Sequence, residues 1–351
     1  MKGWILGLAA AVAAFAAYLL LWPVSIEPAR WDPPPAPSLT GVYATNNALE
    51  DVVRLPVGFA PESVTIDAAG KVVCGLEDGR LVRYNLCDET VSTIASLGGR
   101  PLGMIFDAEG ELIVCDLYGR LIAVSLSGAV RELVTAVDGE SFGLVNDVDI
   151  AADGTIYFTE SSTETTDTLL DLLEHRGHGR LLAYHPGAGV VEVLLDGLFY
   201  ANGVALSADE SFVLIVETTK YRVRRLWLVG PRSGRTDVFI DNLPGFPDGI
   251  SCDEEGTFWL ALMNPRNSFI DWALQRPWIR KVAARLPLSL FAGSAPRYGF
   301  VLGLDAEGNV LRNLQDPSGD SFAGISCVVH HNGDLYLGSL LEEAVGRLSL
   351  P

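Results

Sequence analysis

Six copies of one short unit organise most of this chain. In each copy a short apolar strand is followed by a tight turn, in most copies of the form Asp-x-x-Gly, and by a second apolar strand. Several copies add the letters GRL and a third strand. The copies span residues 61–86, 101–126, 145–162, 201–219, 247–264 and 322–340. Strand meanders that begin 40 to 75 residues apart are typical of propellers rather than sandwiches. We therefore predict an all-β fold, a six-bladed β-propeller over residues 46–351.

The N-terminus begins with a long apolar run. Nineteen uncharged residues extend from Trp4 to Trp22, which as a helix is long enough to cross a bilayer. A cleaved secretory signal is the alternative, but its apolar core is usually shorter. We predict an uncleaved transmembrane helix over residues 1–23 and a single-pass membrane protein. Lys2 is the only charge before the run, so the positive-inside rule places the N-terminus in the cytoplasm and the propeller on the extracytoplasmic side.

Two further segments interrupt the repeats. Residues 24–45 contain PARWDPPPAPSLTG, which predicts a Pro-rich linker that holds the propeller off the membrane. Residues 264–300 have apolar residues at helix-like intervals and predict an insertion with one or two short helices. This insertion contains six Arg or Lys residues, one Asp and several aromatic residues. It forms either a lid or a membrane-surface patch, or it is a solvated loop packed on a blade edge.

Composition limits the possible partners. The formal net charge of −19 and the sequence pI near 4.6 repel phosphate backbones, so we expect no nucleic acid partner. Five cysteines without a CxxC pair predict no zinc site. Outside the cytoplasm Cys74 and Cys87 are candidates for a disulfide, and buried thiols are the alternative.

One position recurs in the units, eight residues before the turn glycine or the residue that replaces it. In four units it carries a side-chain oxygen, and in one it is Leu102. The sixth unit is shifted by one residue and offers only Ala323 or Ile325. Inner strands line the central channel of a propeller. The four oxygen-bearing residues, which we call the axial ring, are Glu62, Asn146, Asn202 and Asp248.

Two carboxylates and two amides on one axis suit Ca²⁺, which takes oxygen ligands in flexible geometry. Mg²⁺ prefers strict octahedral geometry, and Zn²⁺ prefers His or Cys. The alternative is that Asn and Asp simply begin turns. Because Glu has no such preference, Glu62 favours the metal site.

The repeat set, together with VNDVDIAADGTIYFTESS, ANGVALSADES, FPDGI and HNGDLYLGSL, resembles the strictosidine synthase-like family, in particular its membrane-anchored branch. The wider superfamily includes paraoxonases, gluconolactonases and diisopropyl-fluorophosphatase, which are six-bladed propellers with Ca²⁺ in the axial channel. The resemblance implies that Glu62, Asn146, Asn202 and Asp248 are the metal ligands. The true synthase uses a glutamate near its last repeat, whereas GISCVVHHNGD has none, so strictosidine synthesis is not expected.

A channel-bound Ca²⁺ with open positions polarises carbonyl or phosphoryl oxygens. The leading hypothesis is a calcium-dependent hydrolase of small-molecule esters or lactones. The resemblance to lactonases makes Asp248 the candidate catalytic base, although it is alternatively a ligand only. Asp147 is a candidate for a supporting residue or for a structural ion site. The two rival hypotheses are a non-catalytic, calcium-stabilised binding propeller and an organophosphate hydrolase.

Overall fold

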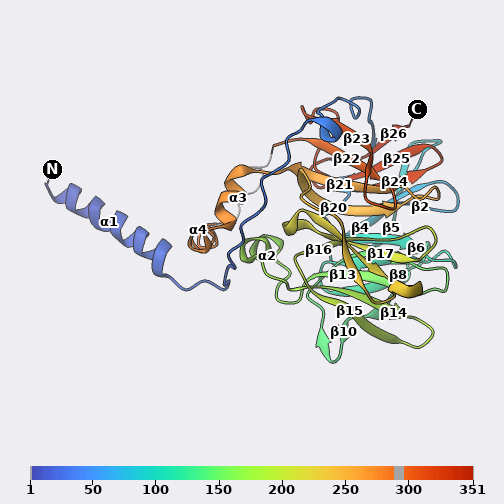
Figure 1. The fold of residues 1–351 in the computed structure, drawn as a ribbon, viewed down its shortest axis with the longest axis horizontal. Helices are drawn as coiled ribbons and strands as arrows, with labels where there is room; N and C mark the ends of the chain where they lie inside the picture. The colour runs from blue at the N-terminus through green and yellow to red at the C-terminus, as the bar shows by residue number, and fades with distance from the viewer. Residues whose placement is uncertain (1, 288–295, 351) are drawn as a thin grey trace.

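Six four-stranded antiparallel sheets surround a central axis, and a long helix projects from one side of this assembly (Figure 1). The computed structural model describes residues 2–287 and 296–350. The predicted six-bladed β-propeller is confirmed, and helix α1 (Lys2–Leu21) contains an apolar candidate membrane span, Trp4–Leu21. Residues 288–295 of the predicted insertion, together with the chain ends at 1 and 351, lie outside the described residues.

Each blade runs from an inner strand to an outer strand. Blade 1 consists of β2 (Val64–Ile66), β3 (Val72–Gly75), β4 (Arg80–Asn85) and β5 (Thr90–Ser96). Blade 2 consists of β6 (Pro101–Phe106), β7 (Leu112–Asp116), β8 (Arg120–Val124) and β9 (Val130–Val134). Blade 3 consists of β12 (Leu144–Ile150), β13 (Ile156–Ser162), β14 (Gly179–His185) and β15 (Val190–Leu198). Blade 4 consists of β16 (Ala201–Leu206), β17 (Phe212–Glu217), β18 (Arg222–Trp227) and β19 (Thr236–Ile240). Blade 5 consists of β20 (Gly245–Cys252), β21 (Phe258–Pro265), β22 (Gly299–Leu304) and β23 (Val310–Asp316). Blade 6 consists of β24 (Ile325–His331), β25 (Asp334–Ser339), β26 (Ala344–Ser349) and β1 (Val53–Pro56). A small hairpin, β10 (Ala136–Val137) and β11 (Glu140–Ser141), lies between blades 2 and 3 in sequence.

The turn between the first two strands of a blade is built on a short polar side chain. In blade 1 the Asp67 Oδ1 accepts the N–H groups of Ala69 at 2.8 Å and Lys71 at 2.9 Å. Gly70 has φ of +72° there, a conformation that glycine adopts at little cost. In blade 4 Glu210 takes the place of the glycine with φ of +53°. The Ser207 hydroxyl then accepts the N–H of Phe212 at 3.1 Å, so a hydroxyl replaces the aspartate.

The ring of blades is closed by the first strand. β1 pairs with β26, with Leu55 opposite Val345, although the two strands lie at opposite ends of the propeller sequence. Leu55 is buried in a core cluster with Val64, Tyr336 and Val345, which belong to blades 1 and 6. This pairing covers an edge of blade 6 that would otherwise be open.

Arginines at the start of the third strands of blades 3 and 4 pair with buried carboxylates. Arg180 of β14 contacts Glu160 at the end of β13, with Nη2 and Oε2 2.6 Å apart. The other Glu160 oxygen accepts the N–H of Gly143, from the segment that enters the blade, at 2.6 Å. Blade 4 repeats this arrangement, because Glu217 pairs with Arg222 and accepts the N–H of Phe199 at 3.0 Å. Each pair therefore ties the second and third strands to the start of the blade.

All the α-helices of the propeller lie on one face. They connect second to third strands, and their bounds are α2 (Thr168–Glu174), α3 (Ser268–Leu274) and α4 (Pro277–Ala283). Asp167 and Asn267 cap α2 and α3 by accepting backbone N–H groups of the first turn. We call this side the helical face; the Asp-x-x-Gly turns lie on the opposite face. The described residues also contain three 3₁₀ turns, η1 (Gly41–Tyr43), η2 (Thr218–Lys220) and η3 (Gly230–Arg232).

Residues 24–45 form a strap along this face, where the sequence predicted a spacer. The Ala29 N–H donates to the carbonyl of Glu174 at 3.0 Å, and the Trp31 N–H donates to that of Leu274 at 3.1 Å. The Trp31 indole stacks on the buried His175 ring with centroids 4.8 Å apart. The strap passes between α2 on one side and α3 and α4 on the other (Figure 1), so the sequence between α1 and the propeller is held against the domain.

Part of the basic charge of the insertion has a structural role. Arg280 of α4 is buried and donates to the carbonyls of Leu173, Leu274 and Ala29, which belong to α2, α3 and the strap. Arg266 is held by Asp271 at 2.8 Å and by the carbonyl of Pro34. These two arginines therefore join the helices and the strap.

The disulfide considered between Cys74 and Cys87 does not form. Antiparallel pairing of β3 with β4 places Cys74 opposite Val82, and Cys87 is exposed beyond the end of β4. All five cysteines lie within the described residues as free thiols.

We expect Leu55→Ala to lower the free energy of unfolding of the full chain by about 2–4 kcal/mol, because it removes a buried side chain from the closing strand. Val53→Ala in the same strand changes an exposed side chain and should alter the free energy of unfolding by less than about 0.5 kcal/mol. Urea unfolding of both variants in detergent provides the measurement. Equal effects would show that β1 contributes little to closure.

We predict that the buried His175 makes the stability of the fold around the strap sensitive to acid. Burial, and then the charges of Lys220 and Arg280, lower the pKa of His175 to about 3, whereas an unfolded histidine has a pKa of about 6.5. The unfolded chain binds the extra proton between these values, so stability falls as the pH falls through this window. We expect the Tm of the full chain to fall relative to that of His175→Asn as the pH is lowered from 6.5 to 4.5. Asn tolerates the positive φ of +52° at this position. His331→Asn, on the opposite face, should keep the original slope; an unchanged slope in His175→Asn would contradict the prediction.

Candidate functional site

The four residues of the axial ring line one cavity on the helical face. This cavity has a volume of about 460 Å³, and a second cavity of about 170 Å³ extends along the axis toward the opposite face. Glu62, Asn146, Asn202 and Asp248 line both cavities. The structure thus brings together the four residues that the count from the turn glycines selected, and they form a floor between the two halves of the channel.

β-bulges present three of the four ring side chains to the channel, whereas Glu62 lies just before the regular strand β2. Pairing slips between Val145 and Val148 in β12, between Ala201 and Val204 in β16 and between Pro247 and Ile250 in β20. These three irregularities enclose Asn146, Asn202 and Asp248. A bulge turns a side chain away from the regular sheet alternation, so the same local device positions each of these residues.

The sixth blade places Ser326 at the corresponding position. Its bulge lies between Ile325 and Cys327, and the Ser326 hydroxyl donates to the Glu62 carbonyl oxygen at 2.6 Å. The sequence count offered Ala323 or Ile325 instead. The difference arises because the bulge in β24, rather than the distance to the turn glycine, determines the position.

Hydrogen bonds orient the two amides of the ring. The Asn202 Nδ2 donates to Asp248 Oδ1 at 2.6 Å and to Thr218 Oγ1 at 3.1 Å. The Asn146 Nδ2 donates to Ser161 Oγ at 2.8 Å. No donor among the described residues reaches either amide oxygen. Both carbonyl oxygens are therefore left to accept a ligand.

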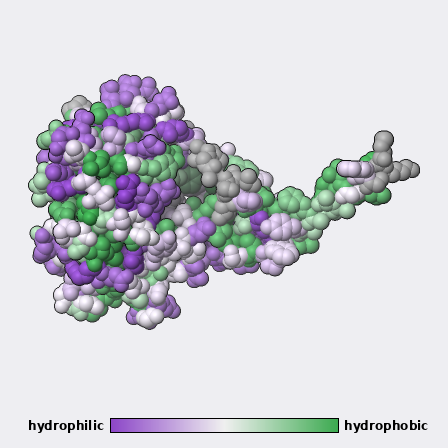
Figure 2. All heavy atoms as spheres, turned by 180° about the vertical axis from the view of Figure 1, so that it is seen from behind, coloured by the Kyte–Doolittle hydropathy of each residue, from purple (hydrophilic) through white to green (hydrophobic). Residues whose placement is uncertain are grey.

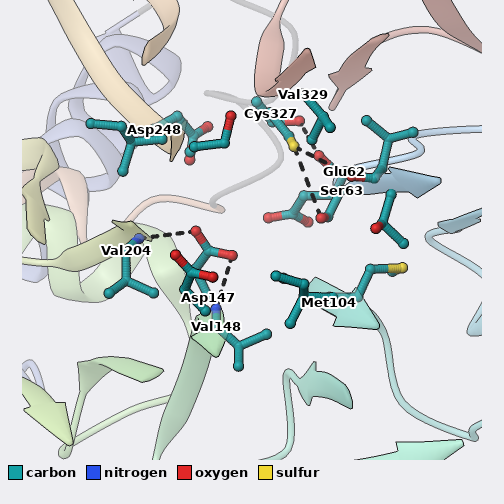
Figure 3. A pocket seen from close by; sticks show the side chains of 18 of the residues that line it. Glu62, Ser63, Met104, Asp147, Val148, Val204, Asp248, Cys327 and Val329 are labelled. Atoms are coloured by element: carbon teal, nitrogen blue, oxygen red, sulfur yellow. Dashed lines mark hydrogen bonds between the residues drawn. The ribbon is translucent and has the colours of Figure 1, made fainter. Parts of the chain in front are cut away.

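Three carboxylates share the space below the floor. Figure 3 shows Glu62, Asp147 and Asp248 around it. Burial raises the pKa of Asp147 to about 7, and the N–H groups of Val204 and Val148, each 3.0 Å from a carboxylate oxygen, partly oppose this shift. Burial and then the charge of Glu62 raise the pKa of Asp248 well above its ordinary value. A bound cation would offset the repulsion among these groups.

Arg100 is a site residue that the sequence did not reveal. Its Nη2 lies 3.0 Å from Glu62 Oε2, and its side chain lines the helical-face cavity. It comes from the connection between blades 1 and 2, outside the repeated pattern, so no spacing rule identifies it. The pair brings a positive charge to the floor of the cavity.

Histidine and serine offer no competing catalytic centre in the part of the chain described. His175 is packed under the strap and His330 lines the opposite cavity, so the helical-face cavity has no histidine among its described lining residues. One G-x-S-x-G pattern occurs at residues 139–143. Its Ser141 lies in the β10–β11 hairpin, whereas a nucleophile elbow is a turn from strand to helix.

The donor set fits a hard cation. Within residues 2–287 and 296–350, no group of three or more His, Cys, Asp or Glu side chains is arranged as a metal site. The axial ring differs from such a group because two of its four members are amides. Two carboxylates with two neutral amide oxygens match the oxygen ligands that Ca²⁺ accepts.

Family models and relatives with known names match most of this chain. A family model described as strictosidine synthase matches residues 146–231, and one described as strictosidine synthase-like, N-terminal, matches residues 41–84. Adipocyte plasma membrane-associated protein from Bos taurus is 36% identical over 359 residues, which cover 95% of this chain and 86% of that protein. Protein strictosidine synthase-like 10 from Arabidopsis thaliana is 36% identical over 329 residues, which cover 85% and 87%.

Solved structures share the fold at low sequence identity. A gluconolactonase from Xanthomonas campestris has a TM-score of 0.64 and 18% identity and covers 94% of this chain and 99% of its own. Regucalcin from Agrobacterium tumefaciens, described as a calcium-binding protein, has a TM-score of 0.60 and 16% identity and covers 85% and 92%.

Proposed function

The chain belongs to the strictosidine synthase-like family, and we propose that it is a membrane-anchored, calcium-dependent hydrolase of small-molecule esters or lactones. The observation that carries the proposal is the axial ring at the floor of an accessible cavity of about 460 Å³. A closed channel would have favoured a binding propeller instead. The gluconolactonase and regucalcin likenesses support the choice of lactone chemistry and of Ca²⁺.

Glu62, Asn146, Asn202 and Asp248 are the residues that would hold the ion. Ca²⁺ bound there would supply a Lewis acid for a carbonyl oxygen. The unpartnered amide oxygens and the mutually repelling carboxylates support this assignment, because a cation satisfies both.

The remaining chemistry belongs to the side chains of the cavity. Asn202 holds Oδ1 of Asp248, and the other Asp248 oxygen is the proposed proton acceptor for an attacking water. Arg100 is positioned to stabilise negative charge that develops on the substrate oxygen. Above the floor, Leu102, Leu144, Leu172, Tyr200 and Phe246 give the cavity an apolar wall for the acyl or alkyl part of the substrate.

We further propose that α1 crosses the membrane with the N-terminus in the cytoplasm and the propeller on the extracytoplasmic side. The apolar span Trp4–Leu21 and the membrane-associated relatives support the anchor. The lone charge of Lys2 before the span supports the orientation.

For the full chain in detergent, we expect excess Ca²⁺ to raise the Tm relative to chelator. At about a hundred times the Kd, the added stability should be about 2.7 kcal/mol. Ca²⁺ should also be required for hydrolysis of phenyl acetate or a simple lactone. Asp248→Asn should lower kcat by about 100-fold or more while the chain stays folded by circular dichroism. Asp241→Asn, an exposed carboxylate, is the matched control.

The two measurements separate the hypotheses. A calcium shift in Tm without turnover would favour the binding propeller. Turnover of a phosphotriester but not of carboxylic esters would favour the organophosphate hydrolase. If Ca²⁺ does not change the Tm, the axial ring is not a calcium site.

Arg100→Gln tests the proposed role of the arginine. We expect kcat for esters to fall about 10- to 100-fold, since one charged contact to the developing oxyanion is lost. The calcium-induced rise in Tm should persist, because removal of a positive charge does not weaken cation binding. Arg131→Gln, whose partner is the surface residue Glu111, is the control. If turnover is unchanged in Arg100→Gln, the role of Arg100 is limited to neutralising the charge of Glu62.

A further inference from the structure

The helical face carries a group of exposed apolar side chains. Phe269 and Trp272 on α3 are 63% and 42% exposed, and Trp278 on α4 is 62% exposed. Ile270, at 39% exposure, lies beside them on α3. We call these four residues the apolar platform. Clustered exposed aromatic residues on a soluble surface mark a site of contact with another apolar body.

The platform is attached to the end of the membrane helix. Arg285, just after α4, donates from Nε to the carbonyl of Trp22 at 2.6 Å and from Nη1 to that of Leu19 at 3.1 Å. The Tyr18 hydroxyl donates back to the carbonyl of Arg285 at 2.8 Å. Because Trp22 follows the last residue of the candidate span, these bonds place α4 at the level where α1 leaves the bilayer.

The rest of the face is fixed at the same level. Lys281 of α4 contacts Glu27 of the strap, with Nζ and Oε2 2.8 Å apart. The strap bonds of Ala29 and Trp31 and the buried Arg280 join α2, α3 and α4 into one unit. α1 extends away from the propeller beyond this unit (Figure 1), and Figure 2 shows hydrophobic surface along α1 that continues onto the adjoining part of the domain.

The mouth of the candidate site lies on this side. The cavity above the axial ring is lined by Thr168 and Leu172 of α2 and by Ile270 of α3. Ile270 therefore belongs both to the cavity wall and to the platform. A surface that covers the platform also lies against the mouth.

We propose that the apolar platform rests on the extracytoplasmic surface of the same bilayer that α1 crosses, so that the cavity opens toward lipid. The bilayer is favoured over a protein partner because α4 is bonded to the end of the span itself. Tryptophan is preferred at this depth of a membrane. The guanidinium of Arg276 lies 4.5 Å from the Trp272 ring centroid, an arrangement in which the charged end faces headgroups while the ring packs on acyl chains.

The position of the mouth indicates a substrate class for the proposed hydrolase, and this second inference rests on the proposed function. Substrates that enter from the lipid surface are esters or lactones with a long hydrocarbon part. The apolar wall above the ring suits such a chain, with the carbonyl group at the floor beside Arg100.

Photocrosslinking of the full chain in phospholipid nanodiscs tests the placement without any assay of activity. A diazirine-bearing phenylalanine analogue would replace Phe269 or Trp278, and Val229 would be the control position. Val229 is 56% exposed and precedes η3 on the opposite face. We expect lipid adducts by mass spectrometry at 269 and 278 and none at 229. Adducts to a second protein copy, or equal lipid labelling at all three positions, would overturn the proposal.

Kinetics in the same nanodiscs test the substrate class. The double variant Phe269→Ser, Trp278→Ser should lower kcat/KM for a membrane-resident long-chain ester about 10-fold and leave hydrolysis of water-soluble phenyl acetate unchanged. Val229→Ser should change neither rate. Equal losses for both esters, or no loss for either, would overturn the lipid route. If neither ester is hydrolysed by the unmodified chain, the proposed hydrolase function fails, whereas the crosslinks still decide the membrane contact.

Discussion

Glu62, Asp147 and Asp248 bring three carboxylates into one buried space on the propeller axis, where burial raises the pKa of each. Charge in such a place is tolerated only where hydrogen bonds or opposite charge compensate it. Asp147 has two backbone N–H groups, and Glu62 has Arg100. Asp248 has one amide of Asn202. The charge at the floor of the cavity is thus only partly compensated by the protein, and a bound cation would add to the compensation.

Bonds between neighbouring blades keep these groups in place. Hydroxyls at the ends of the second strands of blades 3 and 4 donate to inner-strand carbonyls of the next blade. Ser161 of β13 donates to Ala201 at 2.7 Å, and Thr218, just after β17, donates to Pro247 at 2.7 Å. Across the closure between blades 6 and 1, Ser326 of the inner strand β24 donates to the carbonyl of Glu62. Because Ser161 and Thr218 also accept from Asn146 and Asn202, the same hydroxyls position the ring and join the blades.

The repeats made the fold predictable, and they made the ring positions predictable in blades 3 to 5, where the inner strand keeps its bulge at a constant distance from the turn. Glu62 lies at the same distance from its turn glycine but precedes β2, which has no bulge. Blade 6 departs from this distance, so Ser326 was missed. The places of Arg100 and the strap depend on contacts between segments far apart in sequence, and such contacts leave no periodic pattern in the sequence. Cys74 and Cys87 were close in sequence, but strand register set their separation. Local sequence patterns thus predicted the architecture of the blades, whereas the places of Arg100, Ser326 and the strap depend on strand register and tertiary packing.

Closure by β1 and β26 has a consequence for biosynthesis. Val53–Pro56 is translated long before its partner Ala344–Arg347. Until β26 is synthesised, the nascent propeller therefore has an unpaired strand whose hydrogen-bonding edge is open to other chains. The final contacts have very high sequence separation and form late. Loss of β26 alone would leave five complete blades and an open ring, so the codons of this one strand are needed to close the fold.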